Sequence, residues 1–398
     1  MIFLNYINYT YLNGYLEIVP LKRLKEYLPK SPKIFIERFV LISITALKFL
    51  MIKGIKKNDL KKEWLIYQSN NNFDVLINFK NKENSILKIF KDLSFRYLII
   101  YKIIYTIPLF FKLLYLRKLN LFLLFYTSLG YYEEAYRLLK KYKPERILFA
   151  NDHNPVQRAI LKAANNLKIE TFYFQHAHIT KYFPPLDFSV SFLDGQAAYD
   201  IYRGIGKING KVELIGNVKY LSFINKNDTT FISPTIGIAI NQNDDLNRVK
   251  SLVSFINCNL KKYKITIRKH PRDQRNISFN GEYSISSSKD EGSFQFIKKL
   301  NVLIAGNSSI LLEASLLGVQ PIYYCNNIDA MDFDYYGFVR NDLADLLTRK
   351  EDLASVIAKG KKEDYKEKSK YFNEFIKDVN LEKIFKKYNI FLNKNSLI

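Results

Sequence analysis

The sequence predicts an α/β protein with two domains, each built on a parallel β-sheet, and three observations lead to this fold class. The chain has 398 residues, enough for about two to three domains of ordinary size. Between residues 144 and 325, short apolar stretches alternate with stretches of helical spacing, an order typical of parallel strands joined by crossover helices. The polar stretch NKNDTTF at 225–231 interrupts this alternation, which then restarts. We therefore expect two Rossmann-like domains facing a cleft, with a helical N-terminal region.

The alternation ahead of the polar stretch predicts four strands and two helices. Its expected strands lie at 144–152, 170–177, 188–195 and 211–217, and its expected helices at 156–169 and 197–206. The first of these strands is a short apolar stretch that ends in polar residues. Residues 1–140 have mostly helical spacing, with two candidate early strands at 65–68 and 75–79.

The alternation after the polar stretch predicts a second sheet. Its expected strands lie at 235–241, 263–271, 282–288, 301–309 and 319–325, and its expected helices at 244–260, 293–300 and 310–318. After residue 340 the chain is rich in Lys and Glu and reads as helical. We divide the chain into an N-terminal domain at 1–224, a C-terminal domain at 232–375 and a helical tail at 376–398.

Composition excludes several classes of protein. Hydrophobic residues make up 48% of the chain, which excludes a disordered protein. Two cysteines exclude a disulfide scaffold and a cysteine-based zinc site. The net charge is +23, and residues 1–150 carry 26 Lys and Arg against 11 Asp and Glu. A basic excess of this kind bears on binding partners and not on the fold.

The basic residues of the N-terminal region lie among aromatic and aliphatic side chains. Within 95–126 these residues are Arg96, Lys102, Lys112, Arg117 and Lys118. Such a stretch can lie on anionic lipid headgroups, whereas the alternative is a buried helix pair with its charges in solvent. Nucleic acid is not favoured as a partner, because no binding module is recognisable.

No targeting or membrane-spanning segment is expected. The first charged side chain is Glu17, so the N-terminus lacks the basic region of a signal peptide. The uncharged run at 119–132 is shorter than the roughly 20 apolar residues that a spanning helix needs. We expect a cytoplasmic protein, peripheral on the inner face of the plasma membrane.

The segment Gly306-Asn307-Ser308-Ser309 joins an expected strand to an expected helix. Free backbone N–H groups, two hydroxyls and the positive end of the helix dipole make such a segment suited to a phosphate. Glu313, one turn into the helix, can accept hydrogen bonds from ribose hydroxyls. The alternative is an ordinary serine N-cap followed by a glutamate that faces solvent.

A second candidate cluster, Lys269-His270-Pro271-Arg272, ends a strand of the same domain. Its cationic side chains can contact a phosphate, and His270 can donate to a leaving-group oxygen. The alternative is a structural histidine.

The third cluster, Asp152-His153-Asn154, follows the first expected strand of the N-terminal alternation. Asp152 or His153 can act as a general base for a hydroxyl nucleophile, and Asn154 can contact substrate. The alternative is an Asp or Asn cap on the helix that starts at Pro155.

The fourth cluster consists of Gln175, His176 and His178, at another strand end. Substrate contact is favoured over metal binding, because a His-x-His pair without a third ligand is a weak metal motif. The segments 332–334 and 290–292 are acidic, and both are interpreted as loops or turns.

These motifs resemble those of glycosyltransferases with the GT-B fold, over about residues 145–340. The resemblance is carried by FANDHNPVQRAILKAANNLKIETFYFQHAHI, KVELIGN, RKHP and GNSSILLEASLLGVQPIYY. The spacing of His-Pro and Ser-Ser resembles bacterial sialyltransferases, including the capsule polysialyltransferases. The stretch that ends in QHA also resembles capsule Kdo transferases and teichoic-acid glycerophosphotransferases, and the Ser-Ser helix with its Glu resembles UDP-sugar enzymes.

The resemblance to sialyltransferases implies roles for particular residues. By position, His270, Ser308 and Ser309 would hold the phosphate of a CMP-activated sugar, and an acidic residue of the N-terminal domain would be the base. Those enzymes carry an acidic-acidic-Gly motif before the His-Pro, where this chain has Asp152-His153-Asn154.

The function predicted from these resemblances is an inverting, metal-independent glycosyltransferase. Its donor would be a CMP-activated sialic, nonulosonic or Kdo-type sugar, with no separate cofactor. Its acceptor would be a capsule or lipo-oligosaccharide glycan or glycolipid at the inner membrane, bound on the side of the N-terminal domain. The alternatives are a CDP-polyol phosphotransferase, a UDP-sugar transferase or 2-epimerase, and a non-catalytic scaffold.

Overall fold

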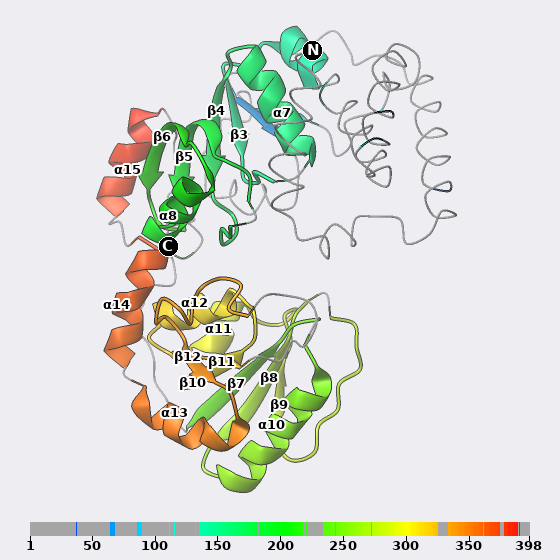
Figure 1. The fold of residues 1–398 in the computed structure, drawn as a ribbon, viewed down its shortest axis with the longest axis vertical. Helices are drawn as coiled ribbons and strands as arrows, with labels where there is room; N and C mark the ends of the chain where they lie inside the picture. The colour runs from blue at the N-terminus through cyan, green and yellow to red at the C-terminus, as the bar shows by residue number, and fades with distance from the viewer. Residues whose placement is uncertain are drawn as a thin grey trace. The chain divides into compact units, whose positions relative to one another are not determined.

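The computed structural model of the chain contains two compact units (Figure 1). The N-terminal unit comprises Met1–Asp194, Ala198–Lys219 and Ile376–Ile398, and the C-terminal unit comprises Gly195–Ala197 and Tyr220–Phe375. The residues that the structure describes are 37, 64–67, 86–89, 111, 115, 132, 135–153, 155–181, 183–217, 220, 234–242, 244–271, 273–324, 333–360, 362–374, 378–388 and 390.

The N-terminal unit is built on a parallel sheet with the strand order β2-β1-β3-β4-β5-β6. The strands are β1 (Trp64–Tyr67), β2 (Ile86–Ile89), β3 (Arg146–Phe149), β4 (Glu170–Phe174), β5 (Asp187–Leu193) and β6 (Asn209–Leu214), and two helices of the alternation are α7 (Pro155–Asn166) and α8 (Gln196–Ile205). The four strands and two helices predicted between 144 and 217 are confirmed. The candidate strand at 65–68 matches β1, whereas the candidate at 75–79 lies outside the described residues.

Aromatic packing fixes the C-terminal segment of the chain to this first sheet. Helix α15 (Asp378–Lys387) ends beside β5, where the ring of Phe192 lies 5.4 Å from that of Phe385 and 5.5 Å from that of Tyr388. Lys387 also forms an ion pair with Glu213 on β6. The predicted helical tail is therefore part of the core of the N-terminal unit, and Figure 1 shows α15 beside β6.

The C-terminal unit is built on a second parallel sheet, with the order β12-β11-β10-β7-β8-β9. The strands are β7 (Thr235–Ile240), β8 (Lys264–Lys269), β9 (Ser284–Ser286), β10 (Val302–Ala305), β11 (Gln320–Tyr324) and β12 (Asp345–Leu347). The helices are α10 (Leu246–Asn259), α11 (Ser293–Ile297), α12 (Ile310–Leu316), α13 (Leu353–Lys359) and α14 (Lys362–Phe372), with the short 3-10 helix η5 at Lys350–Asp352. Strand β12 was not expected, because the chain after 340 was predicted to be helical.

The order of the second sheet creates a switch point in its centre. The chain enters at β7, moves outward through β8 and β9, and then crosses to β10, β11 and β12 on the other side of β7. Ligands of open α/β sheets bind at such a point, beyond the carboxyl ends of the strands. The fold therefore places the ends of β7, β8 and β10 together.

Helices cover both faces of this sheet (Figure 1). Helix α10 buries Val249, Leu252, Val253 and Ile256 at helical spacing, against β-branched residues of the strands. On the other face, a Cβ added at Gly237 of β7 would lie 2.2 Å from Cδ1 of Leu300, which follows α11, and 3.0 Å from Cζ of Phe296 in α11. A side chain at position 237 would therefore have to displace these two buried side chains.

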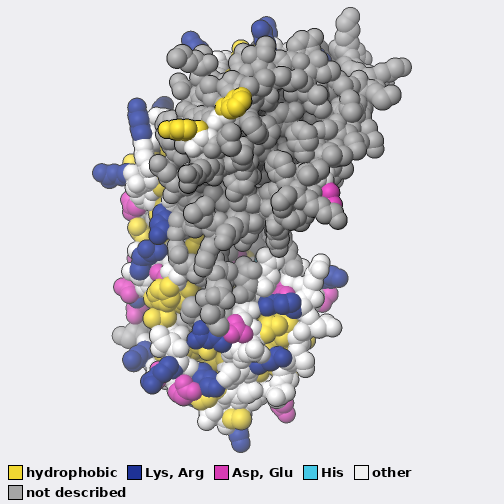
Figure 2. All heavy atoms as spheres, turned by 45° about the vertical axis from the view of Figure 1, so that its right-hand side comes forward, with side chains coloured by type: hydrophobic (Ala, Val, Ile, Leu, Met, Phe, Trp, Pro, Cys, Tyr) yellow, Lys and Arg dark blue, Asp and Glu magenta, His cyan; other side chains and the backbone are white. Residues whose placement is uncertain are grey.

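Basic and acidic side chains are mixed on the described surface in Figure 2, where Lys and Arg side chains are interspersed with Asp and Glu. Most of the basic aromatic stretch at 95–126 lies outside the described residues; of it, Phe111 and Tyr115 are described and have exposed side chains. Within the described part of the chain, no helix has the length and apolarity needed to cross a membrane.

Candidate functional site

The carboxyl ends of β7, β8 and β10 bring two of the predicted clusters to one edge of the C-terminal sheet. Ile240 of β7 pairs with Lys269 of β8, and Ala239 pairs with Ala305 of β10. The loops that begin at residues 241, 270 and 306 therefore leave neighbouring strands. Lys269-His270-Pro271 and Gly306-Asn307-Ser308-Ser309 thus both lie at the switch point.

The serine pair stands where the sequence predicted, at the start of a helix. Ser309 is the N-cap of α12, and its side chain makes no capping hydrogen bond. The hydroxyl of Ser308 accepts the backbone N–H of Ile310 at 3.5 Å. Both serines are half-buried, so their hydroxyls are within reach of a ligand at this helix start.

Gly306 and Asn307 are buried between these serines and β10. The amide oxygen of Asn307 accepts the hydroxyl of Tyr323 at 3.2 Å and the N–H of Tyr335 at 2.9 Å. The side chain of Asn307 therefore anchors the loop to the neighbouring segments of the unit. Any contact between Asn307 and a phosphate is expected to use its backbone.

Glu313 of α12 is buried, with an exposed fraction of 6%, so the alternative of a glutamate facing solvent is wrong. Its carboxylate accepts the hydroxyl of Tyr220 at 3.5 Å. Burial lowers the pKa of the Arg268 guanidinium, and the nearby carboxylates of Glu291 and Glu313 oppose this shift. Glu313 is therefore a buried carboxylate in the first turn after Ser309, within electrostatic reach of Arg268.

Arg268, at the end of β8, is a buried cation. Its guanidinium donates to the hydroxyl of Ser286 at 2.7 Å and to the carbonyl of Glu291 at 2.9 Å, and lies over the ring of Phe296. The turn predicted at 290–292 is confirmed, and this arginine holds it to β8.

His270 has an exposed side chain on a fixed backbone. Its N–H donates to the carbonyl of Ile240 at 2.8 Å, and its carbonyl accepts the N–H of Asp273 at 2.8 Å. Pro271 is also exposed, whereas the ammonium of Lys269 donates to the carbonyl of Arg275. Of this cluster, the imidazole of His270 is the group best presented to a ligand, and Lys269 holds the loop.

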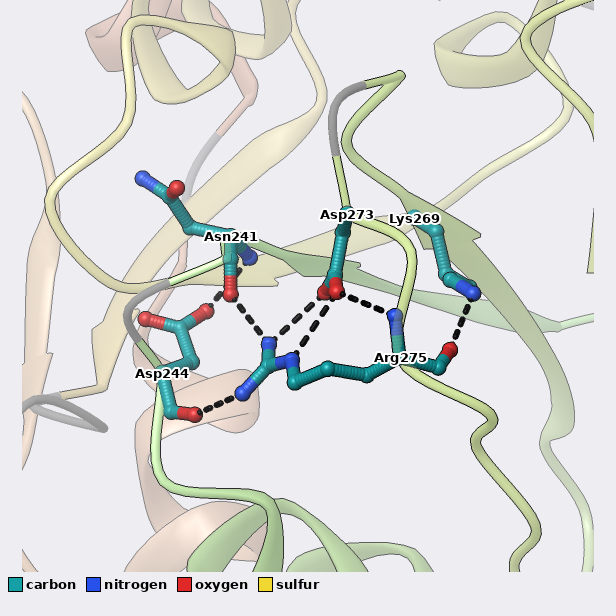
Figure 3. A network of polar contacts seen from close by, with 5 residues as sticks. All are labelled: Asn241, Asp244, Lys269, Asp273 and Arg275. Atoms are coloured by element: carbon teal, nitrogen blue, oxygen red, sulfur yellow. Dashed lines mark hydrogen bonds and ion pairs between the residues drawn. The ribbon is translucent and has the colours of Figure 1, made fainter.

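Arg275 joins the loops that follow β7 and β8 (Figure 3). Its guanidinium donates to the backbone carbonyls of Asn241 and Asp244, each at 2.7 Å. It also forms a two-point ion pair with Asp273, at 2.7 and 2.9 Å. A two-point ion pair of this kind stabilises a loop and also restricts its geometry. This network therefore fixes the position of His270. Of its members, only Lys269 was predicted from the sequence to belong to the site.

Asn241 extends this network across the switch point. Its side-chain amide donates to the carbonyl of Asn307 at 3.4 Å, and its backbone N–H donates to the carboxylate of Asp244 at 2.7 Å. It therefore links the loop after β7 to the loop that carries Ser308 and Ser309.

The N-terminal unit places the third cluster at its own switch point, where β3 follows the β1–β2 pair in the sheet. The side chain of Asn151 accepts the N–H of His153 at 3.1 Å, which closes a tight turn after β3. Asp152 is buried, with an exposed fraction of 2%, whereas the side chain of His153 is 37% exposed. Asn154, like Arg272 of the second cluster, lies outside the described residues.

Asp152 and His153 form a hydrogen-bonded pair. Nδ1 of His153 lies 3.0 Å from Oδ1 of Asp152. Because an ionised carboxylate only accepts hydrogen bonds, Nδ1 is the donor and the neutral ring is left with Nε2 as its acceptor. The edge of the imidazole also contacts the ring of Phe183. This arrangement favours His153 as the base and Asp152 as the group that orients it.

The fourth cluster follows β4, the neighbour of β3. Gln175 is buried and uses its side chain within the unit, accepting the N–H of Asp194 at 2.9 Å and donating to the carbonyl of Ala177 at 3.1 Å. His176 and His178 are half-buried at the same sheet edge. Among the described residues, no group of three or more His, Cys, Asp and Glu side chains could hold a metal ion.

Comparisons with known proteins find the fold but no close relative. No protein-family model and no curated protein matches the chain. Among solved structures, a UDP-N-acetylglucosamine 2-epimerase aligns with a TM-score of 0.50 and 13% identity, over 83% of this chain and 97% of the epimerase. The chain shares the GT-B-type fold of this enzyme. The expected class, α/β with two Rossmann-like parallel sheets, is confirmed.

Two further solved structures align less closely. The Staphylococcus aureus MnaA–UDP co-structure has a TM-score of 0.47 and 11% identity, over 83% of this chain and 97% of that one. The spinosyn rhamnosyltransferase SpnG complexed with spinosyn aglycone has a TM-score of 0.41 and 12% identity, over 65% of this chain and 77% of that one. The more specific resemblance to sialyltransferases and Kdo transferases stays a prediction.

Within the GT-B-type fold, sequence reasoning missed several polar side chains that build the two sheet edges. Asn241 and Arg275 stand in loops of ordinary composition. The hydroxyl of Tyr202 on α8 donates to Asp152, which lies 50 positions earlier in the chain. Arg158 on α7 is buried, and among the described residues its Nε and Nη1 have no hydrogen-bond partner. No local pattern marks these residues, because their roles depend on contacts between distant segments.

The burial of Asp244 leads to a prediction about stability and pH. Burial raises the pKa of Asp244 to about 6, against the opposing effects of the Asn241 N–H and Arg275. The pKa of Asp244 is higher in the folded than in the unfolded state. The stability that the protonated Asp244 carboxyl contributes is therefore complete below about pH 4 and is lost as the pH rises through about 6. The side chain of Asp244→Asn stays neutral at every pH. We therefore expect the free energy of unfolding of this variant, relative to that of wild type, to rise by about 2 kcal/mol between pH 4 and pH 7.5.

Urea unfolding of both proteins at the two pH values measures this gain. A difference between variant and wild type that does not change with pH would contradict the prediction.

Proposed function

We propose that the chain is an inverting glycosyltransferase that uses a nucleotide-activated sugar, with the nucleotide bound by the C-terminal unit. The observation that carries this proposal is the placement of His270, Ser308 and Ser309 at the central switch point of a Rossmann-like sheet. Nucleotide ligands of open α/β sheets bind at that position. The fold supports the proposal, because the same fold serves enzymes that act on nucleotide sugars.

In this proposal, the donor phosphate lies against the start of α12. The hydroxyls of Ser308 and Ser309 donate to phosphate oxygens, and the imidazole of His270 neutralises the charge that develops on the leaving phosphate. Glu313 of α12 accepts hydrogen bonds from the ribose. Gly306, Lys269 and Pro271 shape the two loops.

The N-terminal unit would activate the acceptor. Nε2 of His153 takes the proton of the acceptor hydroxyl, while Asp152 stabilises the imidazolium that forms. The hydroxyl oxygen bonds to the anomeric carbon as the bond from that carbon to the phosphate oxygen breaks, and the nucleotide leaves with the electron pair. Attack opposite the leaving group inverts the anomeric configuration. His176 and His178 would contact the sugars.

The favoured substrates follow from the sequence motifs. The spacing of His270-Pro271 and Ser308-Ser309 favours a CMP-linked sialic, nonulosonic or Kdo-type sugar, and the acceptor would be a capsule or lipo-oligosaccharide glycan. Neither a metal nor a separate cofactor is assigned a step. The basic aromatic stretch at 95–126 would hold the enzyme at the inner membrane surface.

A nucleotide-sugar 2-epimerase is the second candidate, favoured by the TM-score of 0.50 to a structure of that enzyme. An epimerase acts on the donor alone, whereas a transferase needs an acceptor and releases the nucleotide. A CDP-polyol phosphotransferase would also release CMP, but it would leave a phosphodiester in the product.

Product analysis of the full chain with CMP-, UDP-, GDP- and CDP-linked donors tests the proposal. We expect one donor class to be consumed, with nucleotide release that depends on added glycan. Conversion of the donor sugar without acceptor would identify an epimerase, and a phosphodiester product would identify a polyol phosphotransferase. Each of these two results would overturn the transferase proposal.

A further inference from the structure

We propose that Tyr202 is the positioning residue that fixes the Asp152–His153 pair, an inference that rests on the proposed function of His153 as the base. Tyr202 lies on α8 and is fully buried. Its hydroxyl donates to Oδ2 of Asp152 at 2.5 Å, while Oδ1 of the same carboxylate lies 3.0 Å from Nδ1 of His153. The two carboxylate oxygens are thus divided between a tyrosine and a histidine.

The chemistry of Tyr202 suits a permanent donor. Burial, followed by the nearby charge of Asp152, raises the pKa of Tyr202 well above its usual value, so the phenol keeps its proton. The same hydroxyl lies 3.4 Å from that of Tyr173, and because a phenol has one proton we assign it to the shorter contact with Asp152. Hydrogen bonds to an ionised group are stronger than those between neutral groups.

The surroundings of Tyr202 hold its hydroxyl in place. Tyr202 packs in the core of the N-terminal unit together with Tyr173 of β4, whose ring stacks on Phe188 of β5 at 4.8 Å. The phenol therefore cannot swing away from Asp152 without opening this core. Three segments, the loop after β3, strand β4 and helix α8, meet at one carboxylate.

The hydrogen bond from Tyr202 determines which oxygen of the Asp152 carboxylate faces His153. With Oδ2 held by Tyr202, rotation of the carboxylate would break a charge-assisted hydrogen bond, so Oδ1 stays directed at Nδ1. Without the Tyr202 hydroxyl, the carboxylate can turn, and the imidazole is no longer held with its proton on Nδ1. A tyrosine that served only to satisfy a buried charge would stabilise the fold but would leave the tautomer of His153 unchanged.

The tautomer of His153 can be observed by nitrogen-15 NMR on the full chain labelled at histidine. The chain has four histidines, and His153→Asn assigns the signal of interest. In wild type we expect the neutral ring to carry its proton on Nδ1. In Tyr202→Phe we expect a mixture of tautomers, together with a kcat about tenfold lower and a donor KM within about twofold of wild type.

Two further variants complete the experiment. Tyr365→Phe is the matched control, because it also removes a hydroxyl that is hydrogen-bonded to a carboxylate, that of Asp345, in the C-terminal unit. It should change neither the tautomer nor kcat. Asp152→Asn tests the same link from the other partner and should also release the Nδ1 tautomer, which keeps the proposal testable if Tyr202→Phe does not fold.

The readouts separate this inference from the proposed function. An unchanged His153 tautomer in folded Tyr202→Phe overturns the positioning role, whatever the activity. A changed tautomer supports the positioning role even if no donor is turned over, a result that would instead contradict the proposed transferase.

Discussion

His270→Ala is expected to lower donor turnover about 100- to 1,000-fold, because His270 is proposed to neutralise charge on the departing phosphate. The imidazole is exposed, and the backbone hydrogen bonds to Ile240 and Asp273 remain in the variant, so we expect it to fold. The nucleotide should also bind more weakly. Steady-state kinetics with the donor identified by product analysis, together with thermal unfolding, measure both effects.

Gln274→Ala is the matched control for this variant. Gln274 is exposed in the same loop, between Asp273 and Arg275, and has no proposed role. The control should keep wild-type turnover. Turnover at the wild-type rate in His270→Ala would remove His270 from the site.

His153→Ala is expected to lower kcat about 100- to 10,000-fold, the range for loss of a general base. Nucleotide binding should change little, because His153 lies in the N-terminal unit and is proposed to act on the acceptor. The variant also removes the hydrogen bond to Oδ1 of the buried Asp152, so we expect a loss of stability of about 1 to 3 kcal/mol, which thermal unfolding measures.

Comparison with Asp152→Asn separates the two roles in the pair. If His153 is the base, both variants lose activity, and Asp152→Asn retains the more of it. Full activity in His153→Ala combined with inactivity in Asp152→Asn would return the role of base to Asp152.

The regular elements around the site could be predicted from local pattern. Strands β7, β10 and β11 are mostly apolar runs that the sheet buries on both faces, whereas β8 alternates apolar with polar residues. Polar residues follow each of the four strands, so the prediction placed each within a few residues. Strand β12 has no such run: Asp345-Leu346-Leu347 is a three-residue edge strand within a charged segment. Its formation depends on pairing with β11, which local sequence does not encode.

The positions of the loops that carry the candidate site residues were predictable, because ligands of open α/β sheets bind beyond the carboxyl ends of the strands. His270, Ser308 and Asp152 all stand at such ends. Their supporting residues were not predictable: Tyr202 is one of 29 tyrosines, and it lies 50 positions from Asp152. Glu313 could equally have faced solvent, because the orientation of a short helix is decided by what packs on it.

The claim that the C-terminal unit binds a nucleotide is tested most directly by thermal unfolding of the full chain with CMP, UDP, GDP and CDP. A ligand that binds the folded chain alone stabilises it by about 2.7 kcal/mol at a concentration 100-fold above Kd. We predict that one nucleotide raises Tm by at least roughly 3 °C and that His270→Ala reduces this shift. No shift with any of the four nucleotides, together with no heat of binding in calorimetry, would contradict the proposed function.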